Sequence, residues 1–170
     1  MFDLAARRAL VRASGLRRGR VLDVGMGGCA CMSLFLARKG FDVTGIDSSP
    51  QAVHEARQKA EKSRLRGRFE ARRADAKSLP FQDGEFDAVI AFHSLHHADD
   101  VQSVLHEMYR VCRRGGTILV SDFNQQGQKA CDHEQDGGRL LSRVEASLTE
   151  HTRLVRRLTT FFDVMFVCEK

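Results

Sequence analysis

The segment FDAVIAF at 86–92 constrains the fold most, because six of its seven residues are apolar. A strand with one face in water alternates apolar and polar side chains, whereas a strand buried on both faces reads as a nearly continuous apolar run. Such runs are typical of parallel sheets that helices cover on both faces. The chain is therefore expected to fold as an α/β protein around a sheet of this kind.

Helical patterns alternate with strand patterns along the chain, as this fold class requires. The predicted strands are 20–24, 41–46, 68–71, 86–92 and 117–122, and the tail adds two more at 154–158 and 161–168. The predicted helices are 5–13, 30–38, 50–63, 137–148 and one that starts at 101 and ends at the pair Gly115-Gly116. We predict a doubly wound, mostly parallel seven-stranded sheet with helices on both faces and a C-terminal antiparallel hairpin.

Composition and charge narrow the class of protein. With 42% apolar residues and no apolar run near the ~18 residues that cross a bilayer, the chain is expected to be globular without a membrane span. Its five cysteines are an odd number, which indicates reduced thiols and a cytoplasmic setting. The net charge of +5 comes from short arginine clusters without interleaved aromatic residues. A nucleic-acid partner therefore stays open but is not supported.

A glycine-rich turn, DVGMGG at 23–28, joins the first predicted strand to a helix. Gly25 and Gly27 allow a tight turn and a close approach of a ligand, and the helix that follows offers free N–H groups. The pattern Gly25-x-Gly27-x-x-Ala30 also satisfies a dinucleotide-binding fingerprint, so the turn alone does not identify its ligand. Asp47, at the end of the second strand with Ser48 beside it, can accept hydrogen bonds from a ribose in either case.

Further blocks distinguish the two kinds of ligand. The tripeptide ADA at 74–76 follows the third strand, where a carboxylate and a neighbouring N–H can bind an adenine edge. The blocks LPFQDGEFDAVIAFHSLHH at 79–97 and VLHEMYRVCRRGGTILVSDFN at 104–124 come next. With the glycine turn and Asp47, this ordered set resembles the class I S-adenosylmethionine-dependent methyltransferases, especially the small-molecule type of quinone biosynthesis. The resemblance covers about residues 18–123.

The resemblance implies S-adenosyl-L-methionine as the cofactor and S-adenosyl-L-homocysteine as its product. In that family the glycine loop lies under the amino-acid part, the acid after the second strand holds the ribose, and the ADA aspartate faces the adenine. Asp23 would support the loop and the ammonium end. The expected cofactor-binding residues are Asp23, Gly25, Gly27, Asp47, Ser48, Asp75, Ala76 and Phe92.

Two positions depart from the family pattern. Cys29 replaces the last glycine of the commonest first motif, and Arg114 replaces the proline before the pair Gly115-Gly116. The second change is expected to be structural only. We expect Cys29 and Cys31 to be small buried packing residues rather than catalysts.

His93 and His97 are the candidate catalytic residues, because a histidine that titrates near neutral pH can take a proton from a methyl acceptor. The segment 131–134, CDHE, contains residue types that bind metals, but its spacing matches no compact zinc pattern. No metal is therefore predicted, and His133 is considered for contact with the substrate instead.

The prediction is a methyltransferase that transfers a methyl group to an unidentified small-molecule acceptor by in-line displacement. The sparse additions outside the sheet indicate either a shallow site for a large acceptor or a pocket that a second subunit completes, as in a homodimer. A non-enzymatic cofactor- or partner-binding module and an NAD(P)-dependent oxidoreductase remain as alternatives. The chain is predicted to be one domain over 1–170, with an N-terminal helix (1–18), a cofactor-binding core (19–123), a substrate-side insertion (124–150) and a terminal hairpin (151–170).

Overall fold

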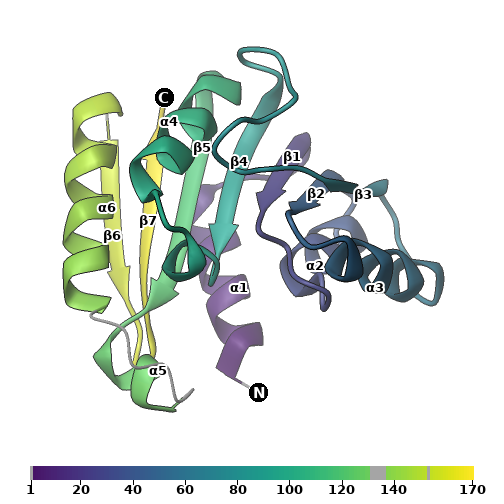
Figure 1. Cartoon of the computed structure of the whole chain (residues 1–170), viewed down its shortest axis with the longest axis horizontal. Coiled ribbons are helices and arrows are strands. Elements are labelled where there is room, and N and C mark those ends of the chain that lie inside the picture. The colour runs from purple at the N-terminus through teal and green to yellow at the C-terminus, as the bar shows by residue number, and fades with distance from the viewer. Residues whose placement is uncertain (1, 131–136, 153) are drawn as a thin grey trace.

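The computed structural model describes residues 2–130, 137–152 and 154–170, and shows a seven-stranded sheet between two layers of helices (Figure 1). The strand order is β3-β2-β1-β4-β5-β7-β6. Strands β1 to β5 are parallel, and β7 runs antiparallel to both β5 and β6, which confirms the predicted sheet and terminal hairpin. The strands are β1 (Arg20–Val24), β2 (Asp42–Asp47), β3 (Phe69–Arg73), β4 (Phe86–Phe92), β5 (Cys112–Phe123), β6 (Leu154–Thr159) and β7 (Asp163–Glu169).

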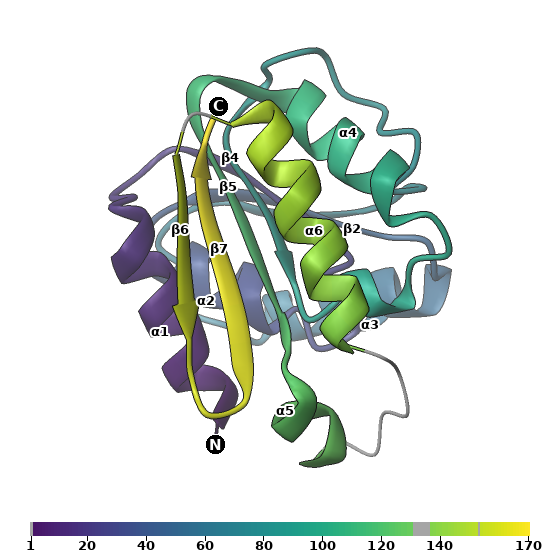
Figure 2. The ribbon, with the colours of Figure 1, turned by 90° about the vertical axis from the view of Figure 1, so that its left-hand side faces the viewer.

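The helices form two layers, and Figure 2 shows α1 and α6 on opposite sides of the sheet. Helices α1 and α2 pack in one core cluster and α4 and α6 in another. None of the described helices combines the length and the hydrophobicity needed to cross a bilayer. The helices are α1 (Phe2–Ser14), α2 (Cys31–Arg38), α3 (Pro50–Glu61), α4 (Val101–Val111), α5 (Gln125–Ala130) and α6 (Gly137–His151), with a 3-10 helix, η1 (Leu95–His97).

Strand β4 shows why its sequence is apolar almost throughout. Ala88 and Ile90 belong to the cluster that α1 and α2 cover, whereas Val89 and Ala91 belong to the cluster that α4 and α6 cover. Successive side chains of a strand point to opposite faces. Because both faces are covered, every one of these four positions is buried.

The predicted helix starts at 50 and 101 are confirmed by their caps. Ser49 Oγ accepts a hydrogen bond from Ala52 N at 3.2 Å, and Pro50 occupies the first turn, where its missing N–H costs nothing. Asp100 Oδ1 accepts one from Ser103 N at 3.1 Å. The Ser49 cap places the start of α3 directly after the end of β2, and the Asp100 cap fixes the start of α4.

The pair Gly115-Gly116 does not end a helix, contrary to the sequence prediction. Helix α4 ends at Val111, and β5 starts at Cys112, which pairs with Phe86 before the register shifts. Gly116 lies in this irregular part of the strand, where a Cβ would be only 2.9 Å from the carbonyl oxygen of Asp87. Gly116 is therefore needed for a close strand contact and Gly115 for its backbone angle of φ +67°. A sequence pattern does not distinguish these needs from a helix stop.

The segment 125–136 lacks a clear pattern, yet its first part is helical. Asn124 Oδ1 accepts hydrogen bonds from Gln126 N and Gly127 N, both at 2.9 Å, and α5 starts directly after this residue. One capping side chain thus sets a helix of 6 residues whose own sequence, QQGQKA, gives little signal.

We expect the terminal hairpin to be an integral part of the core, and two phenylalanines in it provide the test. Phe166 on β7 is fully buried, whereas Phe161 in the hairpin turn is 67% exposed. Phe166→Ala should lower the free energy of unfolding by about 3–5 kcal/mol, because it leaves a cavity. The matched control Phe161→Ala should change it by less than about 0.5 kcal/mol. Urea unfolding followed by circular dichroism measures both values, and equal effects would contradict this account.

Candidate functional site

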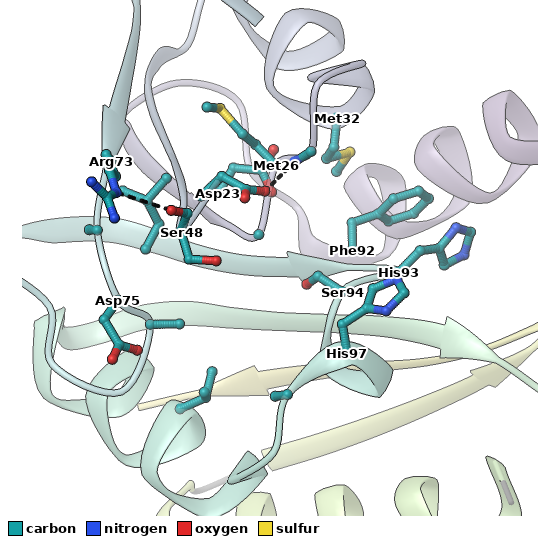
Figure 3. Close-up of a pocket in the computed structure, with 18 of the residues that line it drawn as sticks. Asp23, Met26, Met32, Ser48, Arg73, Asp75, Phe92, His93, Ser94 and His97 are labelled. Atoms are coloured by element: carbon teal, nitrogen blue, oxygen red, sulfur yellow. Dashed lines mark hydrogen bonds between the residues drawn. The ribbon is translucent and has the colours of Figure 1, made fainter. Parts of the chain in front are cut away.

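A cleft of about 930 Å³ opens at the carboxyl ends of the parallel strands, where the strand order reverses between β1 and β4. Such reversals are where open α/β sheets bind their ligands, and this volume is at the upper end for small-molecule sites. The structure brings every predicted site residue to this cleft, several of them drawn in Figure 3. They are Asp23, Gly25, Gly27, Asp47, Ser48, Asp75, Ala76, Phe92, His93 and His97.

The turn after β1 approaches the loop after β4 very closely at Gly25. Gly25 has φ +73°, and a Cβ built on it would lie 2.6 Å from Cβ of Ser94. Ser94 Oγ in turn donates a hydrogen bond to the carbonyl oxygen of Val24 at 2.8 Å. Only glycine fits this position, for its backbone angle and for its lack of a side chain. Sequence reasoning missed Ser94, because nothing local marks a serine that faces another loop.

Asp47 holds the glycine turn from the end of β2. Gly27, with φ +62°, donates its N–H to Asp47 Oδ2 at 3.0 Å, and Ser49 N–H donates to Asp47 Oδ1 at 2.9 Å. A carboxylate offers about four acceptor positions, so each oxygen keeps one for a further donor. Asp47 can therefore support the turn and, at the same time, accept hydrogen bonds from the hydroxyl groups of a ligand.

Asp23 is a buried carboxyl group directly behind the turn. It is 1% exposed, and Ser33 Oγ donates a hydrogen bond to its Oδ2 at 2.6 Å. Removal from water raises the pKa of Asp23 to about 6, although the bond from Ser33 acts in the opposite direction. The residue can therefore interact with a cationic ligand group as a carboxylate at neutral pH, while its ionisation costs the free protein stability.

The loop after β3 contributes Asp75 and Ala76. Asp75 Oδ1 accepts a hydrogen bond from Lys77 N at 2.9 Å, which holds the carboxylate at the edge of the cleft with its other oxygen available. Lys77 forms an ion pair with Asp99 at 3.0 Å. The second oxygen of Asp75 is therefore a hydrogen-bond acceptor at the edge of the cleft.

His93 occupies the end of the cleft next to β4 in an unusual conformation. Its φ is +52°, which non-glycine residues seldom adopt, and its ring stacks on Phe92 at 4.1 Å and on Phe123 at 4.0 Å. Its Nε2 lies 2.6 Å from Oδ1 of the buried Asp163 on β7, and Thr160 Oγ1 donates to Asp163 Oδ2 at 3.1 Å. These contacts fix the ring from several sides. Asp163 is 70 residues away along the chain, so the sequence gave no indication of the pair.

His97 lies at the same end of the cleft, in η1. Its side chain is exposed, and its ring packs on the ring of His96 at 4.0 Å. His96 is buried, and its Nδ1 lies 2.7 Å from Asp122 Oδ1. His96 thus ties the short helix that carries His97 to β5.

The charge of the cleft selects among ligands. Carboxylates line it at Asp23, Asp47, Asp75 and Asp99, whereas its cations are Arg73 and Lys77, the second of which is paired with Asp99. The sulfonium and ammonium groups of S-adenosylmethionine would be attracted by this set, and the pyrophosphate of a dinucleotide would be repelled. The residues present therefore fit S-adenosylmethionine in charge, in space and in hydrogen-bond acceptors.

The expectation that Cys29 and Cys31 are buried is wrong. Cys29 is exposed and Cys31 is intermediate, and both line the cleft. Ala30 between them takes a left-handed conformation with φ 44° and is itself fully buried, which turns Cys29 outward. No set of three potential metal ligands lies together within the described residues, and the segment 131–134, with His133, lies outside them.

Asp23 gives a prediction of how stability depends on pH. Because its pKa is about 6 in the folded chain and 3.8 in the reference state, wild-type stability should fall as pH rises between these values and stay lower above them. Asp23→Asn removes this ionisation, and its amide oxygen can still accept the bond from Ser33. The variant should gain on the order of 2–3 kcal/mol relative to wild type between about pH 4 and about pH 7.5. Urea unfolding at both pH values measures the gain, and a pH-independent difference would contradict the buried ionisation.

Comparisons with known proteins agree with the geometry. Residues 22–120 match the methyltransferase domain family. Phosphatidylethanolamine N-methyltransferase of Cereibacter sphaeroides is 38% identical over 114 residues, which cover 67% of this chain and 55% of that protein. The 27-O-demethylrifamycin SV methyltransferase of Amycolatopsis mediterranei is 38% identical over 109 residues, or 64% of this chain and 40% of that protein. The chain thus spans about half the length of the curated relatives it matches.

The fold is shared with solved structures at lower sequence identity. The crystal structure of an S-adenosylmethionine-dependent methyltransferase from Aquifex aeolicus superposes with a TM-score of 0.76 at 18% identity, over 95% of this chain and 88% of that one. The family match covers more than half of the chain and includes the glycine turn, Asp47 and Asp75. The chain belongs to the class I S-adenosylmethionine-dependent methyltransferase family.

Proposed function

We propose that this protein transfers a methyl group from S-adenosyl-L-methionine to a small-molecule acceptor, with His93 as the group that takes a proton from the acceptor. The observation that carries the proposal is one continuous cleft with the acidic cofactor-binding residues near its middle and the His93–Asp163 pair at one end. The bound cofactor supplies a methyl group that its sulfonium already makes electrophilic. The protein then has to align the two reactants and remove a proton from the acceptor.

Alignment is the larger part of that task. The glycine turn, Asp47 and Asp75 each come from the end of a different strand, so the rigid sheet fixes their spacing. Holding an acceptor atom in line with the methyl group at about 3 Å removes several kcal/mol from the barrier. In-line transfer needs the acceptor on the side of the methyl group opposite the sulfur, and the proposal places the acceptor next to Phe92 and His93 in the same cleft.

The pairing of His93 supports its role as a base. In the tautomer that carries its proton on Nε2, His93 donates a hydrogen bond to Asp163 and keeps the lone pair on Nδ1 for a proton of the acceptor. Thr160 orients Asp163 through its second oxygen. His93 has a strained backbone, stacks on two rings and contacts a buried carboxyl group. Strained residues that are fixed in this way cluster at active sites, which favours a catalytic role over simple packing.

His97 is the second candidate for the same proton transfer. It is exposed at the cleft, and its support by His96 and Asp122 also orients it. We prefer His93 because Asp163 contacts its ring at 2.6 Å and two stacked rings hold it in place. Substitution of each residue separates the two roles.

The acceptor is proposed only as a small molecule whose attacking atom carries a proton. One relative is named for a phospholipid amine and another for an oxygen of a rifamycin, so their names do not agree on one acceptor. Completion of the acceptor side by a second subunit stays a prediction. So does the alternative of a non-enzymatic binding module, which the next experiment tests.

Methyl transfer should be detected when the protein is incubated with S-adenosylmethionine labelled on its methyl group and fractionated small-molecule extracts. Asp47→Ala should weaken binding of S-adenosylhomocysteine at least about tenfold in calorimetry, because it removes charged acceptors, and should reduce labelling accordingly. The control Asp42→Ala changes a carboxylate at the opposite end of β2 and should bind as wild type does. Tight binding of the cofactor without any labelled product would support the binding module instead.

Once an acceptor is known, His93→Asn should lower kcat about 100-fold near neutral pH, because it removes the group that takes the proton. Asparagine tolerates the left-handed backbone at this position, so the change tests the ring rather than the fold. Cofactor affinity should stay within about twofold of wild type. His97→Asn is the matched variant. A loss of kcat in His97→Asn with normal rates in His93→Asn would assign the proton transfer to His97.

A further inference from the structure

Two consecutive arginines at the end of β3 have different surroundings. Arg72 forms a two-point ion pair with Glu70, at 2.6 and 2.8 Å, and its guanidinium lies 5.7 Å from the ring centre of Phe81. Arg73 lines the cleft instead, where its Nε donates a hydrogen bond to the carbonyl oxygen of Ser48 at 3.1 Å. Successive strand residues point to opposite faces, so only the second arginine can meet a ligand in the cleft.

The bond to Ser48 sets the position of the Arg73 guanidinium. Ser48 directly follows Asp47, and Asp75 comes two residues after Arg73, so the group belongs to the same part of the cleft as the two proposed contacts for ribose and adenine. Figure 3 shows Arg73 beside Ser48 on one side of the cleft and Asp75 on another. Within the described residues this hydrogen bond uses Nε, so the two terminal nitrogens and the flat faces of the group can meet a ligand.

The residues nearest Arg73 in the chain have short side chains or an engaged charge. Ser48, Ala74 and Ala76 are short, and the ammonium group of Lys77 is engaged with Asp99. The apolar side chains Ile46 and Val104 of the cleft therefore leave one face of a flat ring for Arg73. A hydrogen bond that Asp75 accepts and one that the Ala76 backbone N–H donates would hold only the edge of an adenine. An arginine can cover its face, because the planar guanidinium stacks on aromatic rings and carries a charge that the ring attracts.

We propose that Arg73 binds the cofactor by stacking its guanidinium on the adenine ring, with the carbonyl oxygen of Ser48 holding it in place. The inference concerns cofactor binding alone, so it does not depend on the acceptor or on either histidine. It adds to the cleft a binding residue that the sequence motifs do not mark.

Calorimetric titration with two probes tests the proposal without a methyl acceptor. The probes are S-adenosylhomocysteine and 5′-methylthioadenosine, which keeps the adenine and ribose but lacks the amino-acid part. Arg73→Ala should weaken binding of both by about fivefold, since stacking at an exposed site is worth that much. Arg73→Lys should recover only part of the loss, because a point charge replaces a plane. Arg72→Ala is the matched control and should stay within about twofold of wild type.

Three results would overturn the proposal. One is wild-type affinity of Arg73→Ala for both probes, and another is an equal loss in Arg72→Ala. The third is a loss with S-adenosylhomocysteine that is absent with 5′-methylthioadenosine, because the arginine would then act on the amino-acid part. Thermal unfolding of each variant without ligand confirms that the exposed substitutions leave the fold intact.

Discussion

The close approach of Gly25 to Ser94 is the contact on which the rest of the site depends. It joins the turn after β1 to the loop after β4 at the point where the strand order reverses. The N–H groups of Gly25 and Met26 both donate to the carbonyl oxygen of Ile46, at 2.9 Å each, which ties the same turn to β2. The turn is thus held by β1, by β2 and by the loop after β4. The cleft opens beside this turn.

The cleft combines rigidity with an unfavourable concentration of negative charge. Buried Asp23 lies behind a turn that Asp47 also supports, and the charge of Asp47 adds to the raised pKa of Asp23. A ligand with two positive groups relieves this repulsion, so binding recovers free energy that the empty protein loses. Repulsion between carboxylates in the free protein is expected at a site for a cationic cofactor. The negative pyrophosphate of a dinucleotide would add to this repulsion.

Much of the fold could be predicted from the sequence because its signals are local. The apolar run of β4, the caps Ser49 and Asp100 and the glycine turn each reveal their role within a few residues. The misjudged features depend on contacts between distant segments. Gly116 is required by Asp87, Cys29 turns outward because Ala30 is buried, and Asp163 meets His93 across the sheet. Sequence motifs identified the expected cofactor-binding residues, whereas the contacts of His93 with Asp163 and Phe123 could be found only in the three-dimensional structure.

The antiparallel direction of β7 has a consequence for how such a protein can change its substrate. A parallel strand would bring its last residue to the edge that carries the cleft, but β7 brings its first, Asp163, together with the turn that precedes it. That turn, which includes Thr160, lies outside the strands that hold the glycine loop and Asp47. Changes in the length or sequence of the hairpin tip would therefore alter the His93 end of the cleft while the glycine turn and Asp47 stay in place. In the proposed function, such changes would alter which acceptor is methylated and leave the binding site of the methyl donor untouched.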